Sequence, residues 1–181
     1  YRSLFDGEVG AYNNDEIIFT RGVNQGAENI RVMVIHQLPR SQGGGYNCHG
    51  MTQKQCDAYY MKDGGNCPGK DSEYIDYPAY ANRIDPNPRR EGFVTEENKG
   101  QFPELGNHRV GVSMQYVERE PRFYASVAYN GATWYLLNEP DNANKDKQIF
   151  YYRGSGNGYT NTMFWLRTGI GVMKFVHPDD T

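Results

Sequence analysis

The sequence predicts an α+β fold that is rich in loops. The chain of 181 residues contains 21 glycines and 9 prolines, and its mean hydropathy is −0.81. This composition favours turns and irregular backbone over long regular elements. Aromatic residues make up 14% of the chain, so we expect aromatic side chains to anchor these loops. The length suits one domain with its own core, which we expect to span residues 1–181.

The charge pattern argues against a nucleic-acid partner. The formal net charge is −3 and the sequence has no run of lysine and arginine, whereas binding to phosphates requires clustered cations. No stretch approaches the ~18 consecutive apolar residues of a membrane span. The chain opens at Tyr1 with neither a methionine start nor a signal segment, which indicates a mature product or a fragment of a longer protein.

Two segments near the start have strand character. Residues 15–21 (Asp-Glu-Ile-Ile-Phe-Thr-Arg) read as a short strand of β-branched and aromatic residues. Residues 29–39 alternate only imperfectly, and we interpret them as a second strand. Three glycines follow at 43–45. They could cradle a phosphate, but no Lys-Ser/Thr pair follows them, so we interpret them as a structural loop.

The segment after this loop predicts a capped helix. Thr52 is a suitable N-cap because its hydroxyl can accept from the free amides of the next turn. The helix is expected from Gln53 to about Met61, with Gly64 as its stop. Cys56, Tyr59 and Tyr60 fall on one face of it. Such a stripe is more typical of core packing than of a ligand platform.

Residues 66–101 predict a long surface insertion loop. Four prolines exclude a single helix, and tyrosines recur at a spacing of three. Tyrosine faces can stack on sugar C–H groups while polar neighbours bond hydroxyls. The candidate ligand-binding residues are Tyr74, Asp76, Tyr77, Tyr80, Asn82 and Arg83. The alternative is that the tyrosines only pin the loop onto the body of the protein.

The second half predicts a short helical turn followed by a hairpin. Pro121 suits the first helical position, residues 125–129 read as a strand, and Asn130-Gly131 is typical of a type I′ turn that leads into a returning strand at 133–135. Trp134 could stack on a sugar or pack in the core, and we favour packing. A further strand is expected at 149–152, before a loop rich in glycine and asparagine.

Catalytic patterns are weak. The pair Glu118-x-Glu120 could serve an ADP-ribosyltransferase, but the other strands of that chemistry are missing, and local ion pairs among Glu118, Arg119, Glu120 and Arg122 are the simpler interpretation. With 22 acidic residues, some carboxylate pair would always suit a glycoside hydrolase. We therefore expect no catalytic residue and no cofactor.

Metal-binding patterns are also weak. Residues 141–146 supply oxygen ligands without the spacing of a calcium loop. Cys48, Cys56 and Cys67 contain no Cys-x-x-Cys pair, and the four histidines are scattered along the sequence. We expect no metal site, since structural zinc needs four convergent ligands.

Three motifs in order resemble the SusD/RagB family of outer-membrane lipoproteins. They are Thr-Gln, Asp-Ala-Tyr and Met-x-Asp-Gly within 51–64, Arg-Glu-Pro-Arg-Phe-Tyr with Asn-Gly and Trp from 119, and Thr-Gly followed by Lys-Phe within 168–178. The resemblance covers most of the chain and departs from the family at 66–101. It implies the central part of a longer SusD-like fold, without the helical repeats that flank it.

The resemblance implies nutrient capture rather than catalysis. Family members bind oligosaccharides, or peptides in RagB-like proteins, at the cell surface, and act with a SusC-like TonB-dependent outer-membrane transporter. Membrane attachment would come only through a lipidated N-terminus absent from this chain. The alternative is a segment that scaffolds neighbouring helices and contacts the transporter. Because Cys56 occupies an aliphatic helix position of the family, we expect a disulfide between Cys48 and Cys67.

Overall fold

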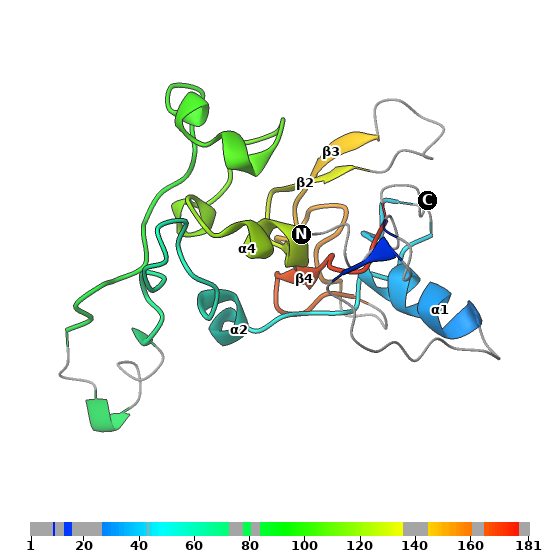
Figure 1. Ribbon diagram of the computed structural model, residues 1–181, viewed down its shortest axis with the longest axis horizontal. Helices are drawn as coiled ribbons and strands as arrows, with labels where there is room; N and C mark the ends of the chain where they lie inside the picture. Colours follow the sequence, from blue (N-terminus) through cyan, green and yellow to red (C-terminus); the bar gives the residue numbers. More distant parts are fainter. Residues whose placement is uncertain are drawn as a thin grey trace.

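The computed structural model describes residues 9, 13–15, 27–42, 44–72, 78–80, 84–135, 145–160 and 165–177. Its longer helices are α1 (Ala27–Gln37), α2 (Gln53–Asp57) and α4 (Pro121–Ser126), and its strands are β1 (Val127–Ala128), β2 (Ala132–Tyr135), β3 (Asp146–Ile149) and β4 (Gly171–Val172). The 3-10 turns within the described residues are η3 (Pro78–Tyr80), η4 (Lys99–Gln101), η5 (Pro103–Leu105) and η6 (Met114–Tyr116). Short elements joined by long loops confirm the predicted α+β, loop-rich fold (Figure 1).

The strands form two small antiparallel sheets rather than the predicted hairpin. β1 pairs with β4, with Val127 opposite Val172, and β2 pairs with β3, with Trp134 opposite Lys147. A tight turn does occur between β1 and β2, but only Gly131 adopts a positive φ, of 89°. A type I′ turn needs positive φ at both central residues. The turn therefore has the type II pattern and passes the chain from one sheet to the other.

The predicted strand at 29–39 is wrong, because this segment forms α1. Val34 and Leu38 lie one helical turn apart and are both buried in one hydrophobic cluster, while Val32 on another face is exposed. The β-branched residues of this segment favour a strand, yet burial at i and i+4 selects the helix. None of the described helices is both long and apolar enough to span a membrane. Of the predicted strand at 15–21, residues 16–21 lie outside the described residues.

The first two motif segments pack against each other. Thr52 caps α2 as predicted, since its hydroxyl accepts from the amide of Gln55 at 3.2 Å. α2 ends at Asp57 rather than near Met61, because the chain beyond it pairs with the segment before α4. Met61 forms an antiparallel bridge with Arg119, and the amide of Glu120 donates to the carbonyl of Tyr60 at 3.0 Å. Backbone pairing with a distant segment thus shortens the helix.

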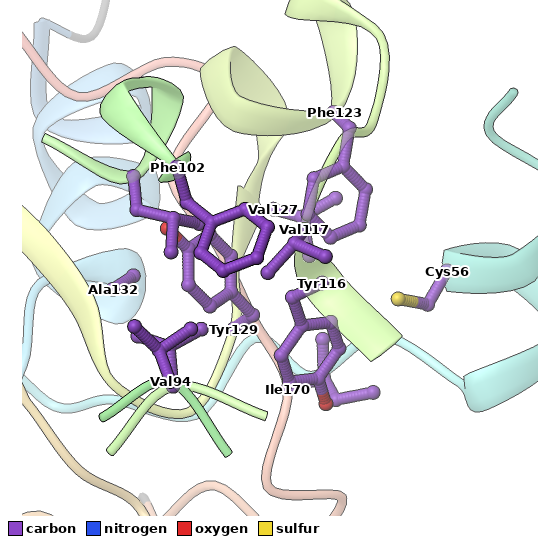
Figure 2. Close-up of a cluster of buried hydrophobic side chains, with 12 residues drawn as sticks. Cys56, Val94, Phe102, Tyr116, Val117, Phe123, Val127, Tyr129, Ala132 and Ile170 are labelled. Atoms are coloured by element: carbon purple, nitrogen blue, oxygen red, sulfur yellow. The ribbon is translucent and has the colours of Figure 1, made fainter. Parts of the chain in front are cut away.

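Two clusters of buried side chains form the core. The first is aromatic and contains Phe123, Tyr116 and Tyr129 (Figure 2). The Phe123 ring lies 5.6 Å from that of Tyr129 and 5.8 Å from that of Tyr59. The second joins α1 to β2, β3 and the segment around β4. Its buried members are Val34, Leu38, Ala128, Trp134, Ile149, Tyr151, Leu166, Met173 and Val176. Trp134 is only 1% exposed, which confirms the predicted packing role.

The predicted disulfide between Cys48 and Cys67 is not formed. All three cysteines are free. Cys56 is fully buried at the edge of the aromatic cluster (Figure 2), which confirms its interpretation as a small apolar side chain, and burial raises the pKa of its thiol to about 12. Cys67 lies near Asp57, with 3.9 Å between its sulfur and the carboxylate.

Candidate functional site

A cavity lies between the loop after β3 and the segment before β4. It has a volume of about 620 Å³, which is within the range of small-molecule sites. The residues that line it are Tyr151, Arg153, Tyr159, Thr160, Leu166, Arg167, Thr168 and Gly169. We call it the tyrosine–arginine pocket.

The floor of the tyrosine–arginine pocket is part of the protein core. Tyr151 and Leu166 are both buried in the second cluster, and Leu166 is almost fully enclosed. The amide of Tyr151 donates to the side-chain oxygen of Asn130 at 2.7 Å, so it leaves the β3 ladder. This bond explains why the strand predicted at 149–152 ends at Ile149. A floor built from core side chains gives the pocket a fixed base.

The loop at 152–158 is folded tightly beside this floor. The hydroxyl of Ser155 donates to the carbonyls of Phe150 and Tyr152 at 2.6 and 2.8 Å. A Cβ on Gly158 would lie 2.1 Å from the carbonyl oxygen of Tyr152, so no larger residue fits there. These contacts hold the wall of the tyrosine–arginine pocket in one conformation.

Asn157 ties this wall to the loop that follows α1. Its side-chain oxygen accepts from the amide of Ser41 at 3.0 Å, and its side-chain nitrogen donates to the hydroxyl of Ser41 at 3.1 Å. Its carbonyl accepts from the side chain of Asn47 at 3.1 Å. Asn47 and Asn157 are both buried. Two loops more than 100 residues apart in sequence are therefore held together by amide side chains.

The walls of the tyrosine–arginine pocket are aromatic and cationic. The guanidinium carbon of Arg167 lies 5.2 Å from the centre of the Tyr159 ring, a cation–π contact that orients both side chains. Arg153 adds a second guanidinium, and none of the lining residues is acidic. Burial raises the pKa of the Tyr151 phenol, an effect that the neighbouring Trp134 opposes. Its hydroxyl therefore stays protonated at neutral pH.

Most of the residues predicted from the sequence to bind a ligand lie outside the described residues. This holds for Tyr74, Asp76, Tyr77, Asn82 and Arg83. Tyr80 ends η3, and its side chain lies outside what the structure describes. η3 lies on the opposite side of the molecule from α1 (Figure 1). The tyrosine–arginine pocket had no signal in the sequence, because its lining comes from a loop read only as glycine-rich and from a motif read only for its family pattern.

The two glutamates of the Glu-x-Glu motif have separate structural partners. Glu120 pairs with Arg122 at 2.6 Å, as the local interpretation expects. Glu118 instead pairs with Lys62 and Arg90, at 2.6 and 2.8 Å. Both carboxylates are engaged in ion pairs with neighbouring cations, which ties the loops that carry them together.

Arg119 departs most from the predicted local ion pairs. It is buried, and one terminal nitrogen donates to the carbonyls of Cys56 and Tyr59 at 2.7 and 2.8 Å. Its guanidinium lies 4.5 Å from the centre of the Phe123 ring. Arg119 therefore joins the two motif segments instead of neutralising its acidic neighbours.

The other polar candidates have structural explanations or lie outside the described chain. Tyr59 packs on the aromatic cluster as expected, but Tyr60 is 43% exposed, so its predicted core role is wrong. Residues 141–144 of the possible calcium turn lie outside the described residues. Asp146 begins β3 and accepts hydrogen bonds from Asn107 and, at its carbonyl, His108.

Two of the scattered histidines do meet. His36 at the end of α1, Cys48 and His49 place their ligand atoms within 4.8 Å of one another. No sequence pattern indicates this meeting, because His36 is separated from Cys48 and His49 by a loop whose path cannot be predicted from its residues.

Comparison with known proteins gives one match. A family model described as the SusD family matches residues 13–181. No curated protein and no solved structure matches the chain. The match covers nearly the whole sequence, including all three motifs and the tyrosine–arginine pocket. The chain therefore belongs to the SusD family.

Proposed function

We propose that this chain captures oligosaccharides at the bacterial outer-membrane surface and passes them to a SusC-like TonB-dependent transporter. The SusD family is one of nutrient-binding proteins of the outer membrane. The observation that carries the proposal is the tyrosine–arginine pocket, in which aromatic rings, guanidinium groups and threonine hydroxyls line a cavity of about 620 Å³. This is the combination of apolar surface and few polar groups that holds a small ligand.

The lining residues suit reversible binding. The Tyr159 ring, half-buried in the wall, offers an apolar face to sugar C–H groups, and the hydroxyls of Thr160 and Thr168 can exchange hydrogen bonds with sugar hydroxyls. In this proposal, capture and release proceed without covalent chemistry. Affinity arises from stacking and from hydrogen bonds.

The charge of the pocket favours an acidic oligosaccharide. Arg153 and Arg167 are both exposed at the pocket, with no acidic residue in its lining. A guanidinium binds carboxylate or sulfate through two parallel hydrogen bonds, which are stronger than bonds to neutral hydroxyls. A uronic-acid or sulfated glycan therefore gains more here than a neutral one of the same size.

Isothermal titration of neutral and acidic glycans tests this proposal. We expect acidic glycans to bind, and Tyr159→Ala or Arg167→Gln to weaken binding by at least about tenfold, which corresponds to about 1.4 kcal/mol. Tyr152→Ala is the matched control, since Tyr152 is 59% exposed and lies beside the pocket without lining it. Unchanged affinity in both pocket variants would show that the ligand does not bind in the tyrosine–arginine pocket.

The tyrosine-rich loop remains a second proposed site for the same function. Its residues, Tyr74, Asp76, Tyr77, Tyr80, Asn82 and Arg83, combine aromatic faces with polar groups. If the tyrosine-rich loop binds the ligand, Tyr74→Ala and Tyr77→Ala abolish binding, whereas Tyr159→Ala leaves the affinity unchanged. Binding of peptides instead of glycans would favour a RagB-like ligand, and binding of neither would favour a scaffold that contacts the transporter.

A further inference from the structure

A cluster of two imidazoles and one thiol lies at the C-terminal end of α1, apart from the tyrosine–arginine pocket. His36, Cys48 and His49 hold their ligand atoms within 4.8 Å of one another. The two imidazole rings are 5.2 Å apart and inclined at 65°. All three side chains are half-buried, so an ion could reach them while the surrounding protein limits competition from water.

The backbone brings these side chains together. The amides of Cys48 and His49 both donate to the carbonyl of His36, at 2.9 and 3.2 Å. On either side of this contact, Tyr46 donates to Ile35 at 2.8 Å and Asn47 donates to the carbonyl of Leu38 at 3.0 Å. The segment 46–49 thus satisfies two carbonyls in the last turn of α1 and one just beyond it. The cluster is therefore organised by the fold before any ion binds.

The anchoring of this segment is reinforced at Asn47. Asn47 adopts the left-handed conformation, with φ of 48°, and its buried side chain donates to the carbonyl of Asn157. Asparagine tolerates this conformation better than most residues. Such an anchor fixes the direction in which the chain enters Cys48 and His49.

We propose that His36, Cys48 and His49 bind one zinc-type divalent transition-metal ion, with a fourth coordination position open to water. Two imidazoles and a thiolate are borderline and soft ligands, which select zinc and related metals over calcium and magnesium. Three protein ligands with a water in the fourth position is an established tetrahedral arrangement of zinc.

The geometry requires only a small adjustment. Tetrahedral zinc holds nitrogen and sulfur ligands at about 2.0 to 2.3 Å, so the ligand atoms lie roughly 3.3 to 3.8 Å from one another. The three atoms must therefore draw together by about 1 Å, which rotation of the side chains provides. On binding, the Cys48 thiol loses its proton to solvent and the sulfur donates an electron pair to the metal, with no change of oxidation state.

No other group of this kind occurs among the residues that the structure describes. Cys56 is enclosed in the aromatic cluster, and Cys67 lies beside Asp57 and the Pro68 carbonyl. His108 is engaged with Asp146. Cys67 and His108 therefore serve as matched controls of the same residue types.

Titration of the reduced protein with Co²⁺ tests the proposal. Co²⁺ substitutes for zinc and reports a bound thiolate by a charge-transfer band in the near ultraviolet. We expect one Co²⁺ per chain, displaced by Zn²⁺. Cys48→Ser should abolish the band. His36→Gln or His49→Gln should weaken Co²⁺ binding by at least about 100-fold, because losing even a residue that only hydrogen-bonds to a metal ligand lowers metal affinity about 10- to 100-fold.

The control variants Cys67→Ser and His108→Gln should keep both the band and the affinity. A second measurement needs no variant: Zn²⁺ should slow the alkylation of Cys48, which is the half-buried cysteine, as mapped by mass spectrometry. Absence of the charge-transfer band in the wild-type protein would overturn the proposal, as would a band that survives in Cys48→Ser or alkylation of Cys48 that zinc does not slow.

Discussion

At the scale of single residues, buried charge joins segments that are distant in sequence. Asp57 is 3% exposed, and its carboxylate accepts from Arg89 at 2.6 Å and from Gln53 at 2.7 Å. Arg119 is buried among carbonyls rather than carboxylates. Such groups tolerate no loss of a partner, because an unsatisfied buried polar group costs more than the hydrogen bond itself contributes.

Arg119 gives the first prediction. We expect Arg119→Ala to lower the free energy of unfolding by about 3 kcal/mol, because it removes hydrogen bonds to the carbonyls of Gln115, Cys56 and Tyr59 and the contact with the Phe123 ring. Arg122→Ala should cost less than about 1 kcal/mol, since Arg122 pairs with Glu120 at the surface. Urea unfolding followed by circular dichroism measures both. Equal effects of the two substitutions would contradict the role assigned to Arg119.

Glu118 gives a pH-dependent prediction. Hydrogen bonds from Lys62 and then Arg90 lower the pKa of its carboxyl below the ordinary value of 4.5. A depressed pKa in the folded state contributes stability that is fully present above 4.5 and is lost as pH falls toward the lowered pKa. We therefore expect Glu118→Gln to flatten the acid limb of the stability profile, measured by urea unfolding between about pH 3 and 7. Parallel profiles for both proteins would show that the pair contributes nothing.

At the scale of elements, sequence signals succeed where they are local. The Thr52 cap is confirmed, and so is the position of Pro121 at the first residue of α4, because capping and proline geometry depend on neighbouring residues only. Sequence signals fail where contacts with distant segments determine whether an element forms or where it ends. α2 is shortened by pairing of its following residues with the segment around Arg119, and α1 is a helix despite its β-branched residues because of what Val34 and Leu38 contact.

The turn at Gly131 gives a prediction about an element boundary. A Cβ at Gly131 would meet Phe150 and Val112, each at 3.2 Å, in addition to the strain of its positive φ. Gly154 shares the positive φ but has open space, and Gly156 has open space and no such φ. We expect Gly131→Ala to lower the free energy of unfolding the most of the three substitutions. Gly154→Ala should lower it by about 1 to 2 kcal/mol, and Gly156→Ala by less than about 0.5 kcal/mol.

Thermal and urea unfolding of the three variants separate strain from crowding. The difference between Gly131→Ala and Gly154→Ala reports the crowding alone. If the three alanine variants were equally stable, neither the turn geometry nor the packing around it would be as described.

At the scale of the whole molecule, the short sheet of β1 and β4 lies between the two core clusters. Val127 belongs to the aromatic cluster, whereas its neighbour Ala128 belongs to the second. Successive residues of a strand point to opposite faces, so two residues of β1 reach both clusters. The tyrosine–arginine pocket stands on the second cluster through Tyr151 and Leu166. The sequence predicted the class of fold but not this arrangement, because it depends on which strands pair.

This shared strand predicts that the two clusters unfold together. In a Trp165→Phe background, Trp134 is the remaining tryptophan and its fluorescence reports the second cluster alone. Phe123→Leu alters only the aromatic cluster, and we expect it to cost about 1 to 2 kcal/mol. Because β1 couples the clusters, the Trp134 transition and the far-ultraviolet circular dichroism transition should shift to lower denaturant by the same amount. Tyr152→Phe, at an exposed position, should shift neither. A Trp134 transition that stays in place while circular dichroism moves would show that the clusters unfold as separate units.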